Sequence, residues 1–407
     1  DGQTLAETPD SSAWEFDFWD RTRMDLTLGV GAAGVSHHLV LGDRTYLRSH
    51  AAVTAQRTVW DQQRLADDLS LRPDFVLRST NGRASLGTML THKLSPQHVS
   101  RSGVSVQALV YDLDLRAAPG HVPPLVSVAE GDGRSTFVQA FTQSRLTPAR
   151  GVDLTLGLHA QHLALTGHTA VEPRLGLTWA ATDRQEVRLG YGLHSQIEDL
   201  RIYLVRPDGT AQPNRDLDAA RAHHLVIGTT RRLSESLRVG VEGYVQRLFG
   251  VPVVADSSFS LINVRQDWTF AEALVNEGAG ENVGVEVTLE RLLRDGVYAL
   301  LTGSLFRSRY RGGDGVWRPT RFDQRYAVNA LVGREVRVGA RNLLGLNVRV
   351  AALGGERRSP VDEAASAQRE EVVYDETRAF ADRAPGVWVV DLTATYRLNG
   401  RHVSQVW

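Results

Sequence analysis

The 407-residue chain contains no cysteine, which excludes disulfide bonds, thiolate metal sites and a cysteine nucleophile. It also lacks any apolar run near the roughly 18 residues that a membrane-spanning helix requires. The formal net charge of -1 gives no indication of a nucleic-acid partner. A composition of 42% hydrophobic and 23% charged residues would suit a soluble globular protein. The informative feature is therefore the order of the residues rather than their totals.

Apolar and polar residues alternate near the end of the chain. Trp388, Val390 and Leu392 are separated by Val389 and Asp391, and the pattern continues to residue 398. Successive side chains of a strand point to opposite faces, so such a segment has one apolar and one polar face. The same alternation recurs at residues 153–159, 174–179, 187–194, 238–246, 283–290 and 344–350.

Strands of this kind follow one another along the chain, and about 9 to 11 tilted residues suffice to cross a bilayer. We predict about sixteen of them, at residues 23–38, 44–58, 82–94, 98–114, 135–147, 151–166, 169–182, 185–196, 219–233, 236–248, 279–293, 296–310, 323–337, 342–353, 385–398 and a stub from 402. Residues 72–79 could form a separate strand in a loop outside the membrane. No segment has the periodicity of a helix.

The connections between these strands are of two alternating kinds. Short polar turns, such as the one at Asn399-Gly400, suit tight hairpins. Long connections rich in Gly, Pro, Asp, Arg and Ser cover residues 116–134, 197–218, 249–278, 311–322 and 354–384. Outer-membrane barrels have this arrangement, with short periplasmic turns and long extracellular loops. We therefore predict an all-β, antiparallel transmembrane β-barrel with hydrocarbon outside and water inside.

Several segments also resemble a known family. They are Val171 to Trp179, Leu189 to Gln196, Ser257 to Asn263, Asn276 to Glu286 and Leu301 to Tyr310. In their sequence and in their order along the chain, these segments resemble the barrel of TonB-dependent outer-membrane receptors, in the branch that carries a carboxypeptidase-regulatory-like domain. The likeness runs from about residue 80 to the end of the chain.

The resemblance implies a barrel of about 22 strands, an N-terminal plug domain and a TonB box that couples import to the inner membrane. The chain departs from this pattern, because it shows no recognisable plug, no TonB box and no full-length terminal strand, since the strand that begins at His402 stops at Trp407 and is shorter than its predecessors. We therefore expect residues 1–407 to be one barrel domain, a fragment without its plug and its C-terminal end.

Eight charged or imidazole residues fall on the polar faces of the predicted strands and are candidates for lining the lumen: Arg174, Arg188, His194, Arg238, Glu242, Glu286, Arg349 and Asp391. Arginine binds carboxylate and phosphate well, so the four arginines could guide an anionic solute or hold an acidic plug. We favour the alternative that they pair with Glu242, Glu286, Glu290 and Asp391 across neighbouring strands.

The sequence contains no catalytic motif, and we expect neither an enzyme nor a bound cofactor. A metal site at His159, His162 and His168 is disfavoured, because the first two face opposite sides of a strand and the third falls in a turn.

The predicted function is import of a nutrient across the Gram-negative outer membrane, driven by the TonB complex through a plug domain. Expected partners are outer-membrane lipids and the nutrient ligand, and a surface lipoprotein is a further candidate. The alternatives are a passive porin-like channel and a barrel protease or lipase. The sequence does not identify the ligand.

Overall fold

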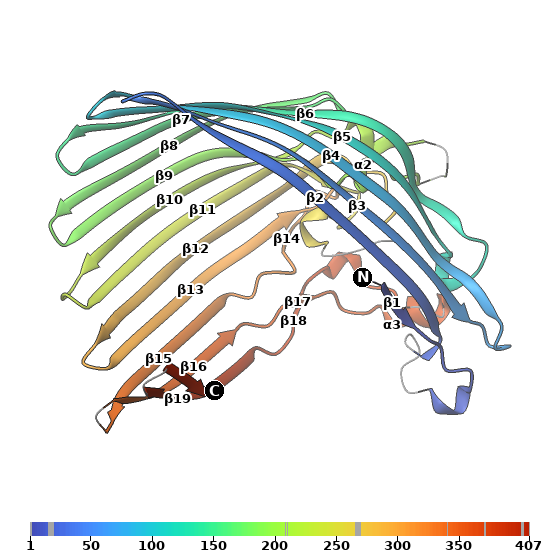
Figure 1. Ribbon diagram of the computed structural model, residues 1–407. Coiled ribbons are helices and arrows are strands. Elements are labelled where there is room, and N and C mark those ends of the chain that lie inside the picture. The colour runs from blue at the N-terminus through green and yellow to red at the C-terminus, as the bar shows by residue number, and fades with distance from the viewer. Residues whose placement is uncertain are drawn as a thin grey trace.

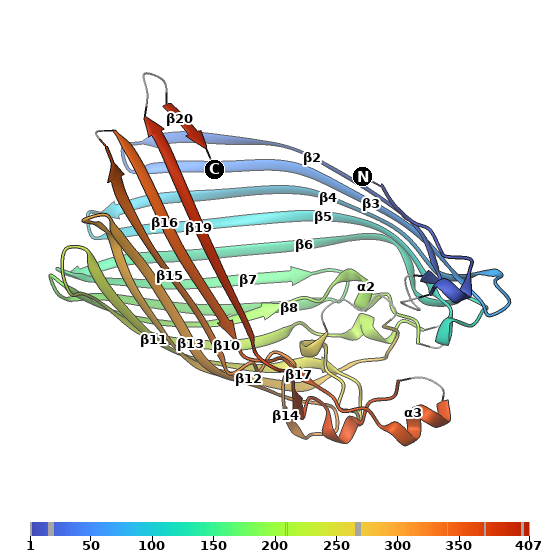
Figure 2. The ribbon, with the colours of Figure 1, turned by 90° about the horizontal axis from the view of Figure 1, so that it is seen from below.

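A single large antiparallel sheet forms almost the whole structure. The computed structural model describes residues 2–14, 20–207, 209, 211–264, 270–339, 341–369, 372–399 and 403–406. Its main sheet has 18 strands, and β17 (Arg357–Arg358) and β18 (Asp382–Arg383) form a separate pair. The main sheet curves into an open trough, as Figures 1 and 2 show. Among the described residues the strands at its two edges do not pair with each other, so the trough is not closed.

Strands that follow one another in the chain are, with few exceptions, neighbours in the sheet. The long strands are β2 (Thr22–Gly42), β3 (Thr45–Leu65), β4 (Leu71–Ser95), β5 (His98–Ala117), β6 (Val126–Ala149), β7 (Val152–Leu163), β8 (His168–Thr182), β9 (Gln185–Gln196), β10 (Ala220–Arg232), β11 (Leu237–Val253), β12 (Val275–Arg294), β13 (Val297–Arg311), β15 (Tyr326–Val338), β16 (Asn342–Leu353) and β19 (Val387–Asn399). The short strands are β1 (Gly2–Leu5), β14 (Trp317–Pro319) and β20 (Val403–Val406).

The predicted all-β antiparallel architecture is confirmed, and all sixteen predicted strands have a counterpart. The last counterpart is β20, whereas Gly400, Arg401, His402 and Trp407 lie outside the described residues, as does Ala340. Two short helices, α2 (Leu200–Tyr203) and α3 (Glu363–Arg369), lie in connections that were expected to have none. No helix in the described part of the chain is long and apolar enough to cross a membrane.

The prediction of a separate loop strand at residues 72–79 is wrong, because these residues are the beginning of β4. Likewise, the predicted connection 116–134 shrinks to residues 118–125 between β5 and β6. The extra strand length carries its charge on one face, at residues such as Arg116, Glu130 and Asp132, while the opposite face carries apolar residues such as Leu115 and Ala129 that pack against connection 197–219. The apolar face of the extensions is the one that protein covers, on the opposite side from the apolar face further along the same strands. The alternation therefore changes sides, and the expected strands ended too early.

The two ends of the strands differ, as Figure 2 shows, with the hairpin turns at one end and the helices and long connections at the other. We call them the turn end and the loop end. The loop end carries the connections 66–70, 118–125, 164–167, 197–219, 254–274, 312–325 and 354–386.

Connection 197–219 folds back inside the curve of the sheet, where Figure 1 shows α2 beneath β4 to β6. Its backbone pairs with the edge of β6. Glu130 N donates to Leu204 O over 3.1 Å, and Arg206 N donates to Val128 O over 3.0 Å. Its apolar residues pack on Leu77, Tyr111 and Leu115. The inner face is thus covered by protein at the loop end, rather than by water as the alternation suggested.

The two faces of the sheet can be followed from strand to strand, because residues paired between neighbouring strands have their side chains on the same side. We call the side that α2 covers the inner face and the opposite side the outer face. Large apolar side chains are exposed on the outer face, including Val285 at 50%, Leu305 at 68% and Leu392 at 77%. Such a continuous exposed apolar surface is unusual for a soluble protein and suits contact with hydrocarbon.

Two neighbouring residues of β12 test this assignment. Val287 lies on the outer face and Thr288 on the inner face. We expect Val287→Arg to lower the free energy of unfolding in lipid vesicles by about 2 to 4 kcal/mol, because it places a charge in hydrocarbon. Thr288→Arg should have little effect. Tryptophan fluorescence during denaturant titration measures both variants, and equal losses would contradict the assignment.

Candidate functional site: a polar groove on the inner face

One row of residues crosses the inner face from β9 to β13. The strand register aligns Arg188, Gly228, Glu242, Glu286 and Ser304 in that order. The row forms part of a hollow of about 450 Å³ that Arg238 and Glu290 also line. Four of the eight predicted residues therefore meet in one place: Arg188, Arg238, Glu242 and Glu286.

The ion pairs in this hollow leave negative charge unpaired. Arg238 pairs with Glu290 on the neighbouring strand, and Arg188 pairs with Glu186 on its own strand. Glu286 accepts a hydrogen bond from the Ser304 hydroxyl over 3.4 Å. Within the described part of the chain, neither Glu242 nor Glu286 forms an ion pair. Because two carboxylates lie opposite each other on adjacent strands, the floor of the hollow attracts cations.

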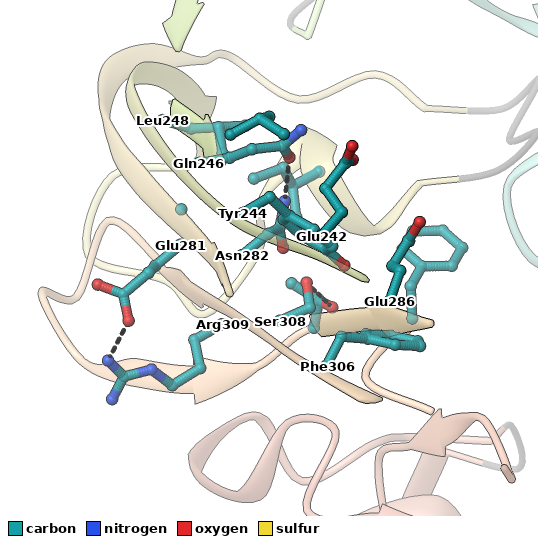
Figure 3. A pocket seen from close by; sticks show the side chains of 15 residues that line it. Glu242, Tyr244, Gln246, Leu248, Glu281, Asn282, Glu286, Phe306, Ser308 and Arg309 are labelled. Carbon is teal, nitrogen blue, oxygen red and sulfur yellow. Dashed lines mark hydrogen bonds and ion pairs between the residues drawn. The ribbon is translucent and has the colours of Figure 1, made fainter. Parts of the chain in front are cut away.

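The hollow continues toward the loop end into a second space of about 560 Å³, shown in Figure 3. Both spaces are lined by Glu242 and Glu286, and we call them together the inner-wall groove. In the second space Asn282 Nδ2 donates to Gln246 Oε1 over 3.0 Å. Ile262, Thr320 and Phe322 approach from connections 254–274 and 312–325. The strands therefore form the wall of the groove, and two connections border it at the loop end.

Aromatic rings give the groove apolar surface beside its polar groups. The Tyr244 ring lies over Gly284, where an added Cβ would come within 2.5 Å of the Tyr244 hydroxyl oxygen. Only glycine leaves room for the ring to lie flat on the sheet. Phe306 lies nearby on β13 (Figure 3). The groove thus offers a ligand carboxylates, amides and aromatic surface together.

The ring centre of the candidate His194 lies 4.7 Å from that of His224. Arg174, a further candidate, belongs to a separate cluster around the buried Glu172. This carboxylate accepts hydrogen bonds from His159 Nδ1 at 2.9 Å, Arg174 Nη2 at 2.8 Å and the Ser195 backbone N–H at 2.8 Å. The β8–β9 ladder ends at the Arg174–Gly192 pair. Pro173 follows Glu172 and has no N–H for the ladder. The carboxylate therefore takes up a backbone donor of β9 beyond the point where the ladder ends.

The remaining candidates, Arg349 and Asp391, form an ion pair of 3.2 Å between β16 and β19. The predicted pairing across neighbouring strands thus holds for Arg238 and Arg349. It is wrong for Arg174 and Arg188, which pair with Glu172 and Glu186 two residues away on their own strands. Side chains two positions apart share a face, and the prediction did not weigh these nearer partners.

His168 is also placed differently from the prediction, since it is the first residue of β8 rather than part of a turn. It is buried and its Nδ1 lies 3.0 Å from the Asp218 carboxylate. Among the described residues, no group of three or more His, Asp or Glu side chains could hold a metal ion.

Asp323 joins two connections at the loop end of the groove. Its buried carboxylate lies 3.1 Å from Arg325, 3.2 Å from Arg357 and 3.2 Å from Arg383. It also accepts the backbone N–H of Ser308 over 3.1 Å. One carboxylate thereby ties connections 312–325 and 354–386 to β13. Nothing in the sequence marked this residue, because its partners Arg357 and Arg383 lie far from it along the chain.

Glu198 lies where connection 197–219 leaves β9. Burial, and to a smaller extent repulsion from Asp199, raises the pKa of Glu198 to about 7. Its backbone N–H donates to the Tyr203 hydroxyl over 2.9 Å, so the residue is attached directly to the packed part of the connection. Ionisation of this carboxyl group therefore opposes the packing of α2.

The chain matches the family model described as "TonB dependent receptor-like, beta-barrel" over residues 2–406. No curated protein has significant sequence similarity to it. Solved structures share its fold at low sequence identity. The ferric preacinetobactin receptor BauA from Acinetobacter baumannii has 14% identity and a TM-score of 0.64, with 94% of this chain and 57% of that one covered.

Two further receptors give similar values. The ferric-catecholate import receptor Fiu from E. coli K12 has 13% identity and a TM-score of 0.64, with coverages of 93% and 59%. The pyoverdine receptor FpvA from Pseudomonas aeruginosa PAO1 has 11% identity and a TM-score of 0.63, with coverages of 97% and 58%. The chain therefore spans less than two thirds of the length of these receptors. The carboxypeptidase-regulatory-like branch stays a prediction.

Substitution of Asp323 tests the junction at the loop end of the groove. We expect Asp323→Asn to leave three guanidinium groups without their carboxylate, at a cost of about 3 to 5 kcal/mol. Trypsin should then cleave connection 354–386 at least about 100-fold faster, since cleavage tracks the open population. The control is Asp382→Asn, which removes an exposed carboxylate 3.6 Å from Arg378. Equal cleavage of both variants would contradict the role of Asp323.

The raised pKa of Glu198 predicts that the packing of connection 197–219 depends on pH. The folded pKa of about 7 exceeds the ordinary 4.5, so the folded state binds the proton more tightly and packing weakens as pH rises from 4.5 to 7. Amide hydrogen exchange of residues 202–205, corrected for intrinsic rates, should show less protection at the higher pH. Glu198→Gln should abolish this dependence and the exposed Glu235→Gln should preserve it. A dependence that survives in Glu198→Gln would assign it to another group.

Proposed function

Because this chain belongs to the TonB-dependent receptor family, in its β-barrel domain, we propose that it takes part in energised import of a nutrient ligand across a Gram-negative outer membrane. The family comprises outer-membrane transport receptors rather than enzymes, and no catalytic residue is assigned. Experiments must test three parts of this proposal: energised import, the ligand and the partners of the whole protein.

The observation that carries the proposal is the inner-wall groove on a sheet whose outer face is apolar. The groove runs along the strands between the loop end and the turn end. Glu242 and Glu286 lie at its floor and form no ion pair with any residue that the structure describes. A ligand entering at the loop end would first meet connections 197–219, 254–274 and 354–386. It would then pass along polar and aromatic groups rather than through an apolar core.

The charge of the groove supports a particular kind of contact. Arg188 and Arg238 are already paired with carboxylates, so a path for anions is less well supported than contact with a cationic group. In our proposal that group belongs either to the ligand or to a plug domain seated against β9 to β13. Structural neighbours named as a siderophore receptor and as a peptide transporter share only the fold, and they do not select a ligand.

Two partners complete the proposal. A plug domain would couple the barrel to the TonB complex, which supplies the energy, and outer-membrane lipids would surround the outer face. A surface lipoprotein at the loop end stays a prediction.

The conductance of the full-length protein separates energised import from passive diffusion. In planar bilayers we expect each insertion to be closed at rest, because a plug blocks the lumen, and the purified periplasmic domain of TonB should bind the protein. A sustained open conductance with no binding of that domain would support a passive porin-like channel instead. Conductance of a known porin, recorded in the same bilayers, serves as the control.

A further inference from the structure

Five arginines gather on the outer face at the loop end of β10, β11 and β13. On β13, Arg307, Arg309 and Arg311 pair with Val283, Glu281 and Ala279 of β12, so all three lie on the same face as the exposed Leu305. Their neighbours in the cluster are Arg221 on β10 and Arg247 on β11. We call these five residues the arginine cluster.

Acidic residues on this part of the outer face do not neutralise the cluster. Glu281 lies 2.7 Å from Arg309 and 3.9 Å from Arg247, and Arg311 donates to the backbone carbonyl of Glu277 over 3.3 Å. Arg307 is exposed and, in the described part of the chain, has no hydrogen-bond or ion-pair partner. Five guanidinium groups thus face the two carboxylates of Glu277 and Glu281.

The cluster is not a general property of the loop end. On the outer face of β5 and β6, Asp112 lies directly opposite Asp132, and both are exposed. Arg78 and Arg116 on that side of the sheet pair with Asp61 and Asp114. The excess of positive charge therefore lies at the arginine cluster, and electrostatic attraction of anions should be strongest there.

The position of the cluster along the strand is equally specific. Outward positions of a strand follow one another about every 6.7 Å. Arg307 is the first outward residue after Leu305 on the way to the loop end, and Arg309 and Arg311 follow. The Arg309 guanidinium carbon lies 5.5 Å from the centre of the Trp317 ring, and tryptophan is enriched at membrane interfaces. The cluster thus begins where the apolar band ends.

We propose that the arginine cluster binds the phosphate groups of an anionic glycolipid in the outer leaflet. Guanidinium groups bind phosphate with two parallel hydrogen bonds, and basic residues at a membrane surface hold anionic headgroups. The acyl chains of the same lipid would lie along the apolar band at Val283, Val285 and Leu305. The proposal rests on the proposed function, because it requires the outer face to meet a membrane.

The test compares two double variants of the full-length protein in detergent. Arg247→Gln/Arg307→Gln removes two guanidinium groups of the cluster. Arg231→Gln/Arg334→Gln removes two exposed arginines of the same face at the turn end. Native mass spectrometry measures the binding of diphosphorylated lipid A and of the same lipid after enzymatic removal of its phosphates.

We expect the cluster variant to bind diphosphorylated lipid A about tenfold or more weakly than the wild type, with a smaller dependence on salt. The turn-end variant should bind it as the wild type does, and the dephosphorylated lipid should bind all three proteins weakly. Equal binding by both variants, or equal binding of both lipids, would overturn the proposal. Displacement of the lipid by millimolar inorganic phosphate would also overturn it, since the site would then recognise a free anion.

Measuring the insertion of each protein into liposomes distinguishes a failure of the lipid site from a failure of the proposed function. A wild-type protein that remained soluble without detergent and did not insert would overturn both proposals. Insertion of all three proteins, with unaltered lipid binding by the cluster variant, would overturn only the lipid site. Resistance of the unheated barrel to unfolding in dodecyl sulfate shows that each variant is folded.

Discussion

Backbone hydrogen bonding is the constraint on which the rest of this structure depends. In hydrocarbon, water cannot satisfy N–H and C=O groups, so each strand must pair with its neighbours along the whole width of the bilayer. The observed antiparallel ladder does this from β2 to β19. Pro173 is an informative exception, because it lies where β8 parts from β9, and the Glu172 carboxylate there accepts the Ser195 N–H. A polar side chain takes the place of a missing ladder bond.

The same ladder brings two chemically different surfaces onto the same strands. Gln246, Asn282 and Ser308 face the inner-wall groove, while their immediate neighbours in sequence Arg247, Glu281 and Arg309 face outward. Figure 3 shows the Glu281–Arg309 ion pair directed away from the Gln246–Asn282 hydrogen bond. A groove for solutes and a surface for lipid headgroups therefore share three strands, and Glu281 and Arg309 border both of them.

At the loop end the architecture changes from a membrane wall to an ordinary packed protein. Connection 197–219 buries Leu77 and Leu115 against its own apolar residues, and Asp323 binds two other connections to β13. Both arrangements place protein over the inner face at the loop end. The groove is therefore bordered by connections at the loop end and open toward the turn end. Access to the groove from the loop end thus depends on contacts that are separate from those holding the sheet.

The sequence by itself determined the strands, their two faces and the family resemblance, because alternation with a period of two is a local property that hydrocarbon imposes on every strand it touches. It placed Arg188, Arg238, Glu242 and Glu286 on one face for the same reason. Only the tertiary structure decided how far β4 to β6 extend, which partners Arg174 and Arg188 take, and how Asp323 and α2 pack. Those features depend on residues that are distant in sequence, including the connection that covers the apolar inner face of β4 to β6.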